Sequence, residues 1–243
     1  MRNIWTIAKR EFKLFFISPI AYAVAFMILL ILGIIFYSNI VAASVQQYAP
    51  GIQIIVGPLV TLLLFTTPAI TMRSLADEQK TGTLELLLTA PVRDLELIIG
   101  KWLGCFLFVL TIILATVIYP ILLNLMVQPG IDQGLLVTNY LGLALLAGAF
   151  LAVGIAMSSL FSNQIAAFFA TLGVLLLFWM ISYPAQAMGA MGGDFLRYLD
   201  MTEHFYPSFY TGIIEIKDVV YYLSVIVLGI FIGKTAIETR RWR

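Results

Sequence analysis

Charged residues are scarce in this chain of 243 residues, and two long stretches contain none. Only 11% of the residues are Asp, Glu, Lys or Arg, whereas 61% are hydrophobic. Residues 14–72 and 133–193 also lack histidine. A soluble core of this composition would be exceptional, because soluble proteins carry many more charged residues. The shortage of charge therefore indicates a polytopic membrane protein.

The apolar stretches of the sequence have room for six membrane-spanning helices, since one span needs roughly 20 apolar residues. Polar, turn-forming residues at 44–51 and 161–164 divide each of the two longest stretches into two spans. We expect an all-α protein in which residues 1–243 form one transmembrane domain. The expected spans are, in chain order, about 20–41, 52–71, 102–127, 139–160, 165–188 and 219–237.

Residues that perform catalysis or bind metals are equally scarce. The single cysteine, Cys105, has no partner for an internal disulfide, and we expect it to pack as a small apolar residue. The single histidine, His204, has acidic and methionine neighbours, but a copper or zinc site needs a second His or a Cys nearby. We therefore expect His204 to be a solvated loop residue. No catalytic or metal-binding residues are predicted, so the chain is not an enzyme by itself.

A nucleotide-binding loop is also missing. Gly233-Lys234-Thr235 matches the end of the GxxxxGK[ST] motif, but Leu228 occupies the position that requires glycine. The residues around it are apolar and typical of a membrane span. We predict that this chain binds no cofactor.

The few basic residues are concentrated in three segments. Lys and Arg are retained on the cytoplasmic side during membrane insertion. With six spans, all three segments face that side, so both termini and the loop 73–101 are expected in the cytoplasm. Residues 189–218 then form an extracellular segment. The net charge of +1 gives no reason to expect nucleic acid as a partner. The basic residues of the three segments are Arg2, Lys9, Arg10 and Lys13; Arg73, Lys80, Arg93 and Lys101; and Lys234, Arg240, Arg241 and Arg243.

The first 18 residues have the pattern of a helix that lies along the lipid surface. Trp5 and Phe12 belong to an apolar series with three- and four-residue steps, and Lys9, Arg10 and Lys13 fall between them. We expect an interfacial helix over residues 1–18, in contact with the lipid bilayer. The simpler interpretation is that these residues only anchor the first span.

The loop 73–101 is the longest charged segment between spans. Gly82 breaks the helix that precedes it, and residues 83–89 suffice for a short helix with leucines on one side. Pro91 ends that helix. Such an element transmits force if a soluble partner grips it. Alternatively, it is a connector that rests on the lipid surface.

Small residues recur at four-residue steps in two of the expected spans. The series are Gly100-x-x-x-Gly104 and the run of small residues from Ala144 to Ala156. Small side chains allow two membrane helices to approach closely. The partner helix is either another helix of this chain or a helix of a second copy.

The sequence ADEQKTGTLELLLTAPVRDLELIIGKWLG, residues 76–104, resembles the first cytoplasmic loop of ABC-2-type transporter permeases. The similarity is greatest to the branch that includes gliding-motility-associated permeases and copper-processing permeases of nitrous-oxide reductase maturation. The features shared with that branch are Glu78, Lys80, Gly82, Thr83, Glu85, Leu86, Leu87, Leu88, Thr89, Pro91 and Lys101.

This resemblance implies that the loop carries a coupling helix, which docks into a separate ATP-binding cassette subunit. ATP and Mg²⁺ would be bound by that subunit and not by this chain. A second permease copy, or a related permease, would complete the transporter. The residues implied to couple to the ATP-binding subunit are Glu78, Lys80, Gly82, Thr83, Leu84, Glu85, Leu87, Leu88, Thr89 and Pro91.

The expected function is that of a transmembrane permease subunit in an ATP-driven exporter of the bacterial inner membrane. Its apolar spans with scattered Thr, Asn and Gln favour a lipidic or amphipathic cargo. The alternative is a membrane scaffold or enzyme of envelope processing, or a protein that transmits force without transport.

Overall fold

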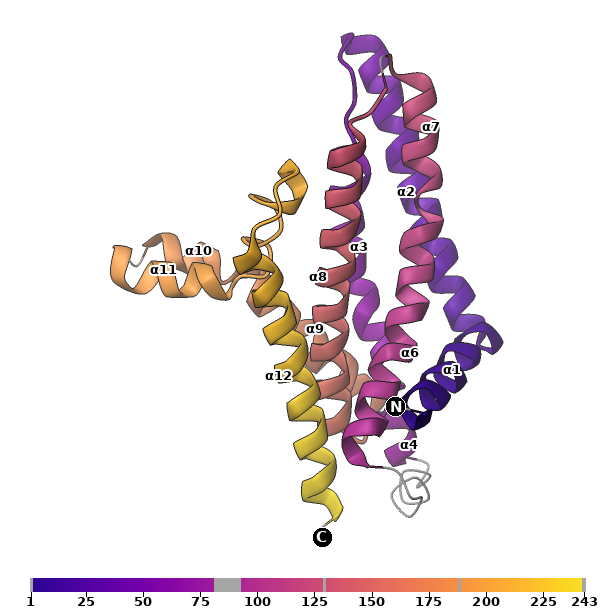
Figure 1. Ribbon diagram of the computed structural model, residues 1–243, viewed down its shortest axis with the longest axis vertical. Coiled ribbons are helices and arrows are strands. Elements are labelled where there is room, and N and C mark those ends of the chain that lie inside the picture. The colour runs from indigo at the N-terminus through magenta and orange to yellow at the C-terminus, as the bar shows by residue number, and fades with distance from the viewer. Residues whose placement is uncertain (1, 81–92, 129, 188, 242–243) are drawn as a thin grey trace.

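The computed structural model describes residues 2–80, 93–128, 130–187 and 189–241. Within these residues the regular elements are all helices, and they form an elongated bundle (Figure 1). The helices are α1 Arg2–Ile17, α2 Pro19–Gln46, α3 Gln53–Thr71, α4 Ala76–Lys80, α6 Asp94–Ala115, α7 Ile118–Met126, α8 Gln133–Leu160, α9 Gln164–Met180, α10 Ser182–Ala187, α11 Gly189–Leu199 and α12 Ile216–Arg241, with a 3₁₀ turn η1 at Phe209–Thr211.

Six helical segments of the described residues are long and apolar enough to cross a membrane. The predicted all-α fold with six spans is therefore confirmed. The segments are Ala21–Gln46, Gln53–Lys80, Asp94–Met126, Gln133–Leu160, Gln164–Pro184 and Ile216–Thr239.

Several helix ends differ from the expected spans for local reasons. The fourth span begins at Gln133, earlier than expected, because the Asp132 carboxylate accepts hydrogen bonds from the backbone N–H groups of Gly134 at 2.8 Å and Leu135 at 3.2 Å. The third span begins at Asp94, where the backbone N–H of Arg93 donates to the Glu96 carboxylate at 3.3 Å.

Helix α8 is the centre of the bundle, and most of its residues are buried. The Trp102 indole of α6 donates a hydrogen bond to the Gly148 carbonyl at 3.0 Å. A Cβ atom built on Gly229 of α12 would lie 2.7 Å from the backbone of Ala152. The small residues of α8 thus serve close packing within this chain, which is one of the two roles expected for them.

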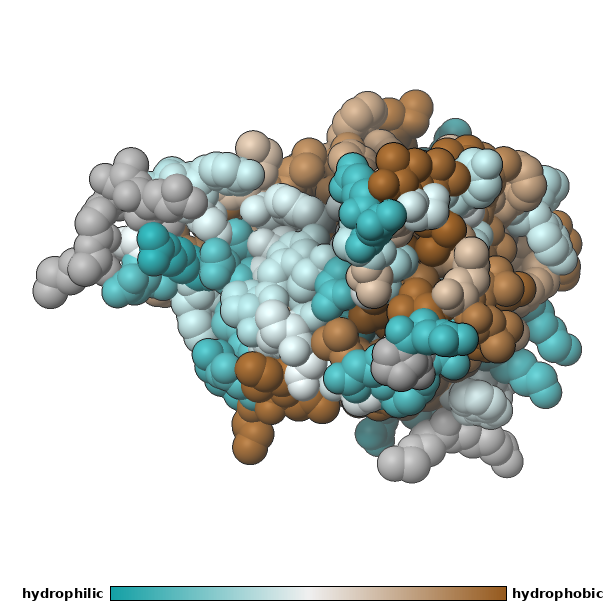
Figure 2. Space-filling view, turned by 90° about the horizontal axis from the view of Figure 1, so that it is seen from above, coloured by the Kyte–Doolittle hydropathy of each residue, from teal (hydrophilic) through white to brown (hydrophobic). Residues whose placement is uncertain are grey.

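Both chain ends and α4 lie at one end of the bundle (Figure 1). We call this the basic end, defined by α1, α4 and the last turns of α12. The α10–α11 pair projects sideways from the bundle near the first turns of α12. Figure 2, viewed from the other end, shows strongly hydrophobic residues gathered over the side of α2 and α7, and paler, more hydrophilic residues toward α10 and α11.

Candidate functional site

A buried lysine joins three helices at the basic end. Lys101 of α6 is only 1% exposed, and its Nζ donates hydrogen bonds to Glu11 Oε1 at 3.1 Å, to Glu78 Oε1 at 2.8 Å and to the Ser74 carbonyl at 2.8 Å. An ammonium group has three donors, so each has an acceptor here. We call Glu11, Ser74, Glu78 and Lys101 the charged junction. It connects α1, α6 and the segment that enters α4.

Gly100 and Gly104, which lie on either side of Lys101 in the sequence, allow α1 to approach α6 closely. A Cβ atom on Gly100 would lie 2.7 Å from the Ile7 side chain, and one on Gly104 would lie 2.5 Å from Glu11 Cβ. Helix α1 therefore packs directly on the backbone of α6, and the Glu11 carboxylate lies over the lysine. The predicted Gly100-x-x-x-Gly104 step is thus a contact within the chain.

Helix α1 presents its cations away from this contact. Trp5 is 58% exposed, and Lys9 and Lys13 are also exposed. Phe12 packs against the core from a half-buried position. Arg10 extends the charged junction, because its Nη2 lies 3.2 Å from Glu11 Oε1 and 3.4 Å from Glu78 Oε1. The structure thus places all five predicted residues of the interfacial helix on α1.

Helix α4 is also fastened to the central helix. The Ser158 hydroxyl oxygen accepts hydrogen bonds from the backbone N–H groups of Leu75 and Ala76, both at 3.1 Å. The Gln79 side-chain amide donates to the Ser159 carbonyl at 2.9 Å. The two bonds to Ser158 satisfy backbone donors at the start of α4, where an α-helix leaves its first N–H groups unpaired. Helix α4 is consequently held to the end of α8.

Two further side-chain contacts link neighbouring elements of the basic end. The Gln164 amide of α9 donates a hydrogen bond to the Asp77 carboxylate of α4. The Asn3 amide of α1 donates to Glu96 Oε2 in the first turn of α6 at 3.1 Å. Displacement of α4 or of the start of α6 would therefore act on α1, α8 and α9.

Two of the predicted coupling residues belong to the part of the chain that the structure describes, and the others do not. Glu78 lies in the charged junction, and Lys80 is exposed at the end of α4. The other predicted coupling residues lie outside the described residues: Gly82, Thr83, Leu84, Glu85, Leu87, Leu88, Thr89 and Pro91. The segment that contains them begins directly after α4 and leads into α6, and the charged junction joins these two helices.

Sequence reasoning did not identify Glu11 as a partner for Lys101. A signal was present, because Glu11 is the only acidic residue before Asp77 and stands among four cations. A lone carboxylate in a basic, amphipathic helix has no evident role at a lipid surface, and a buried cation elsewhere is its natural partner.

The expectation of a solvated His204 is wrong. The ring is 4% exposed, with Nδ1 at 2.7 Å from Asp218 Oδ1 and Nε2 at 2.9 Å from the Tyr198 carbonyl. It stacks on Tyr221 with ring centroids 3.8 Å apart. We call Tyr198, His204, Asp218 and Tyr221 the histidine cluster. It lies where α12 begins, because the turns before α12 fold back over that helix.

Neither end of the molecule holds a metal-binding group in its described part. Across residues 2–80, 93–128, 130–187 and 189–241, no group of three or more His, Cys, Asp and Glu residues is placed to hold a metal ion. Gly233 and Thr235 lie inside α12, where Lys234 pairs with Glu238 at 3.0 Å. A phosphate-binding loop needs free backbone N–H groups, which the interior of a helix does not offer.

Six apolar helices, with α8 buried among the others, define a multi-pass membrane protein. Residues 44–232 match the family described as ABC-2 family transporter protein. The match covers more than half of the chain, so the protein belongs to this family of transporter membrane components. No curated protein matches the chain.

Proposed function

We propose that this chain is the permease subunit of an ATP-binding cassette exporter, and that a separate subunit hydrolyses the ATP. Its membership of the ABC-2 family supports a transport role. Helices α1 and α4 and the last turns of α12, whose sequences contain many of the basic residues, lie at one end of the bundle (Figure 1), which supports a cytoplasmic position for that end. The proposed setting is the cytoplasmic membrane of a bacterium.

The observation that carries the proposed mechanism is the burial of Lys101 between two carboxylates. Separating a buried ion pair leaves uncompensated charge and is strongly unfavourable. Elements joined in this way move together more readily than they separate. When a docked ATP-binding subunit displaces the segment 81–92, both of its flanking helices move, and the charged junction carries α1 with them.

The membrane part of the transporter would contain two such permeases, identical or related. The proposed cargo is lipidic or amphipathic, because the spanning helices offer apolar side chains with a few Thr, Asn and Gln residues. ATP and Mg²⁺ would bind in the partner subunit alone.

Two substitutions in the proposed docking segment test this function. Glu85→Arg reverses a charge, and Leu87→Asp places a charge on the leucine face predicted for the short helix. We expect both variants to insert normally but to lose co-purification with the ATP-binding subunit and to lose stimulation of its ATP hydrolysis. Gly173→Ala is the matched control, because a Cβ atom there meets nothing within 4 Å. Unchanged binding and stimulation in both docking variants would exclude this function and favour a scaffold.

A further inference from the structure

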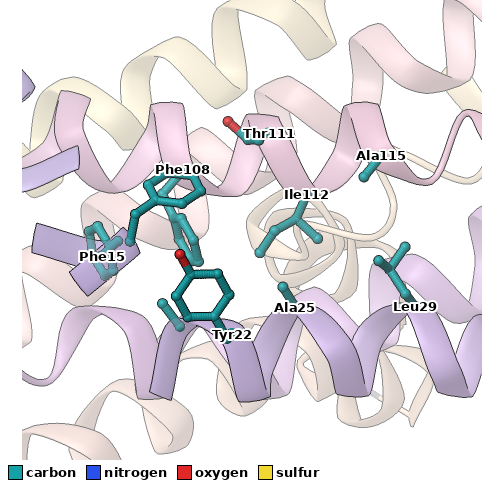
Figure 3. A pocket seen from close by; sticks show the side chains of 10 residues that line it. Phe15, Tyr22, Ala25, Leu29, Phe108, Thr111, Ile112 and Ala115 are labelled. Atoms are coloured by element: carbon teal, nitrogen blue, oxygen red, sulfur yellow. The ribbon is translucent and has the colours of Figure 1, made fainter. Parts of the chain in front are cut away.

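A narrow apolar groove runs between α1, α2 and α6 (Figure 3). Phe15 comes from α1, Ala25 and Leu29 come from α2, and Phe108 and Ile112 come from α6. Ile112 faces Ala25 across the groove. The enclosed volume is about 100 Å³, and its lining is almost entirely apolar. Such a space is suited to hydrocarbon and not to water.

Aromatic residues lie in the groove and beside it. Phe15 stacks on Phe108 with ring centroids 4.6 Å apart. Beyond Leu29, the Tyr119 hydroxyl of α7 donates a hydrogen bond to the Leu29 carbonyl at 2.6 Å. The side remains accessible, because Tyr22 is 57% exposed and Phe16 is 40% exposed. A chain-like molecule can therefore enter from the surface of the bundle.

The apolar groove adjoins a polar cavity through Phe15, which lines both. The polar cavity has a volume of about 230 Å³ and lies against the charged junction. Its wall includes Leu14 and Ile70 on the apolar side and Arg73 on the polar side. The two spaces together form a site with a hydrocarbon part and an ionic part.

The ionic part has an excess of positive charge. Glu11 and Glu78 are both paired with Lys101 and Arg10. Arg73 is exposed and forms no ion pair with any residue that the structure describes. An anionic group would complement this positive charge at the polar cavity.

We propose that this site binds an anionic phospholipid of the bilayer, with its phosphate at Arg73 and one acyl chain in the groove. The apolar lining of the groove fits an acyl chain, and the unpaired charge of Arg73 fits the phosphate of the headgroup. The lipid would lie against α1 and the charged junction. The site is independent of any ATP-binding subunit.

The test is native mass spectrometry of the delipidated full-length chain, titrated with phosphatidylglycerol and with phosphatidylcholine. We expect tighter binding of phosphatidylglycerol. Arg73→Gln should weaken it about fivefold, since one cation near a lipid headgroup contributes that much. Lys9→Gln removes the same charge away from the cavity wall and should change binding by less than about twofold.

A second pair of variants tests the acyl-chain part. Ala25→Phe fills the groove and should weaken both lipids about tenfold, because methylene groups lose their buried position. Ala42→Phe, at a half-buried position of α2 outside the groove, should have no effect. Helix content measured by circular dichroism shows whether each variant folds.

A photoactivatable phosphatidylglycerol gives a readout that needs no substitution. Cross-links from the acyl chain should map to residues 22–29 and 108–115. Cross-links distributed evenly over α2, α9 and α12 would overturn the proposal. Equal competition by glycerophosphate would also overturn it, because a free anion uses no groove.

Discussion

The charged junction and the histidine cluster each centre on a buried, hydrogen-bonded side chain. They differ in how far apart in the sequence the bonded residues lie. Lys101 bonds to residues 90, 27 and 23 positions away. His204 bonds to residues only 14 and 6 positions away. The first therefore holds separate helices together, whereas the second stabilises one local fold of the chain. The comparison shows that the basic end links helices that are distant in sequence, whereas the histidine cluster does not.

The largest effect is expected from Lys101→Met, which leaves Glu11 and Glu78 buried without their cation. Breaking a buried pair costs about 3–5 kcal/mol. The free energy of unfolding in detergent measures this loss. The triple variant Glu11→Gln, Glu78→Gln and Lys101→Met removes all three charges and should recover most of it. A loss below about 1 kcal/mol in Lys101→Met would mean that the junction is not a structural link.

Asp218→Ala is expected to have the next largest effect. It leaves the buried His204 without its carboxylate, and a hydrogen bond to a charged group contributes about 1.5–3 kcal/mol. Hydrogen–deuterium exchange distinguishes the effect of this variant from that of Lys101→Met. Protection should fall only within residues 198–222, whereas Lys101→Met should expose amides of α1, α4 and α6. Loss of protection in α1 in the Asp218 variant would remove the distinction between the two clusters.

Gly104→Ala tests the close approach of α1. The new methyl group would meet Glu11 Cβ at 2.5 Å and the Ala8 carbonyl at 3.1 Å, so α1 must shift. Overpacking of this kind costs about 1–3 kcal/mol. Gly173→Ala, in open surroundings, should be neutral or stabilise by up to about 1 kcal/mol through helix propensity. Thermal unfolding of the two variants in parallel gives the comparison, and equal midpoints would contradict it.

The smallest effect is expected from Arg10→Gln. The Arg10 side chain is half exposed, and its pairs with Glu11 and Glu78 are long. Exposed ion pairs contribute about 0.2–1 kcal/mol. The unfolding free energy should fall by that amount and should become less dependent on salt. A loss as large as that of Lys101→Met would contradict this ranking, because Arg10 would then stabilise the charged junction as much as Lys101 does.

The six spans could be predicted because each contains a long apolar run with little or no charge, and the length of such a run indicates whether it can cross a membrane. The small residues of α6 and α8 predicted close packing, but not which helix would be the partner. Pairing depends on where the helices lie relative to one another, and no local pattern contains that information.

The same limit explains the two buried clusters. Lys101 was recognisable in a motif, but its burial depends on Glu11 of a helix that is distant in sequence. His204 resembled a loop histidine because it follows Asp200 and Glu203 in a segment between two spans. Its partner Asp218 lies 14 residues away at the start of α12. A local pattern cannot show that the intervening turns fold back to bury the ring.

The central claim is that motion from an ATP-binding subunit enters this chain through the charged junction. Hydrogen–deuterium exchange of the complex, with and without a non-hydrolysable ATP analogue, tests it most directly. We predict that ATP-dependent changes occur in residues 2–17, 76–80 and 94–104 and that residues 198–222 stay unchanged. Changes confined to residues 198–222, with none in the helices of the charged junction, would contradict the claim.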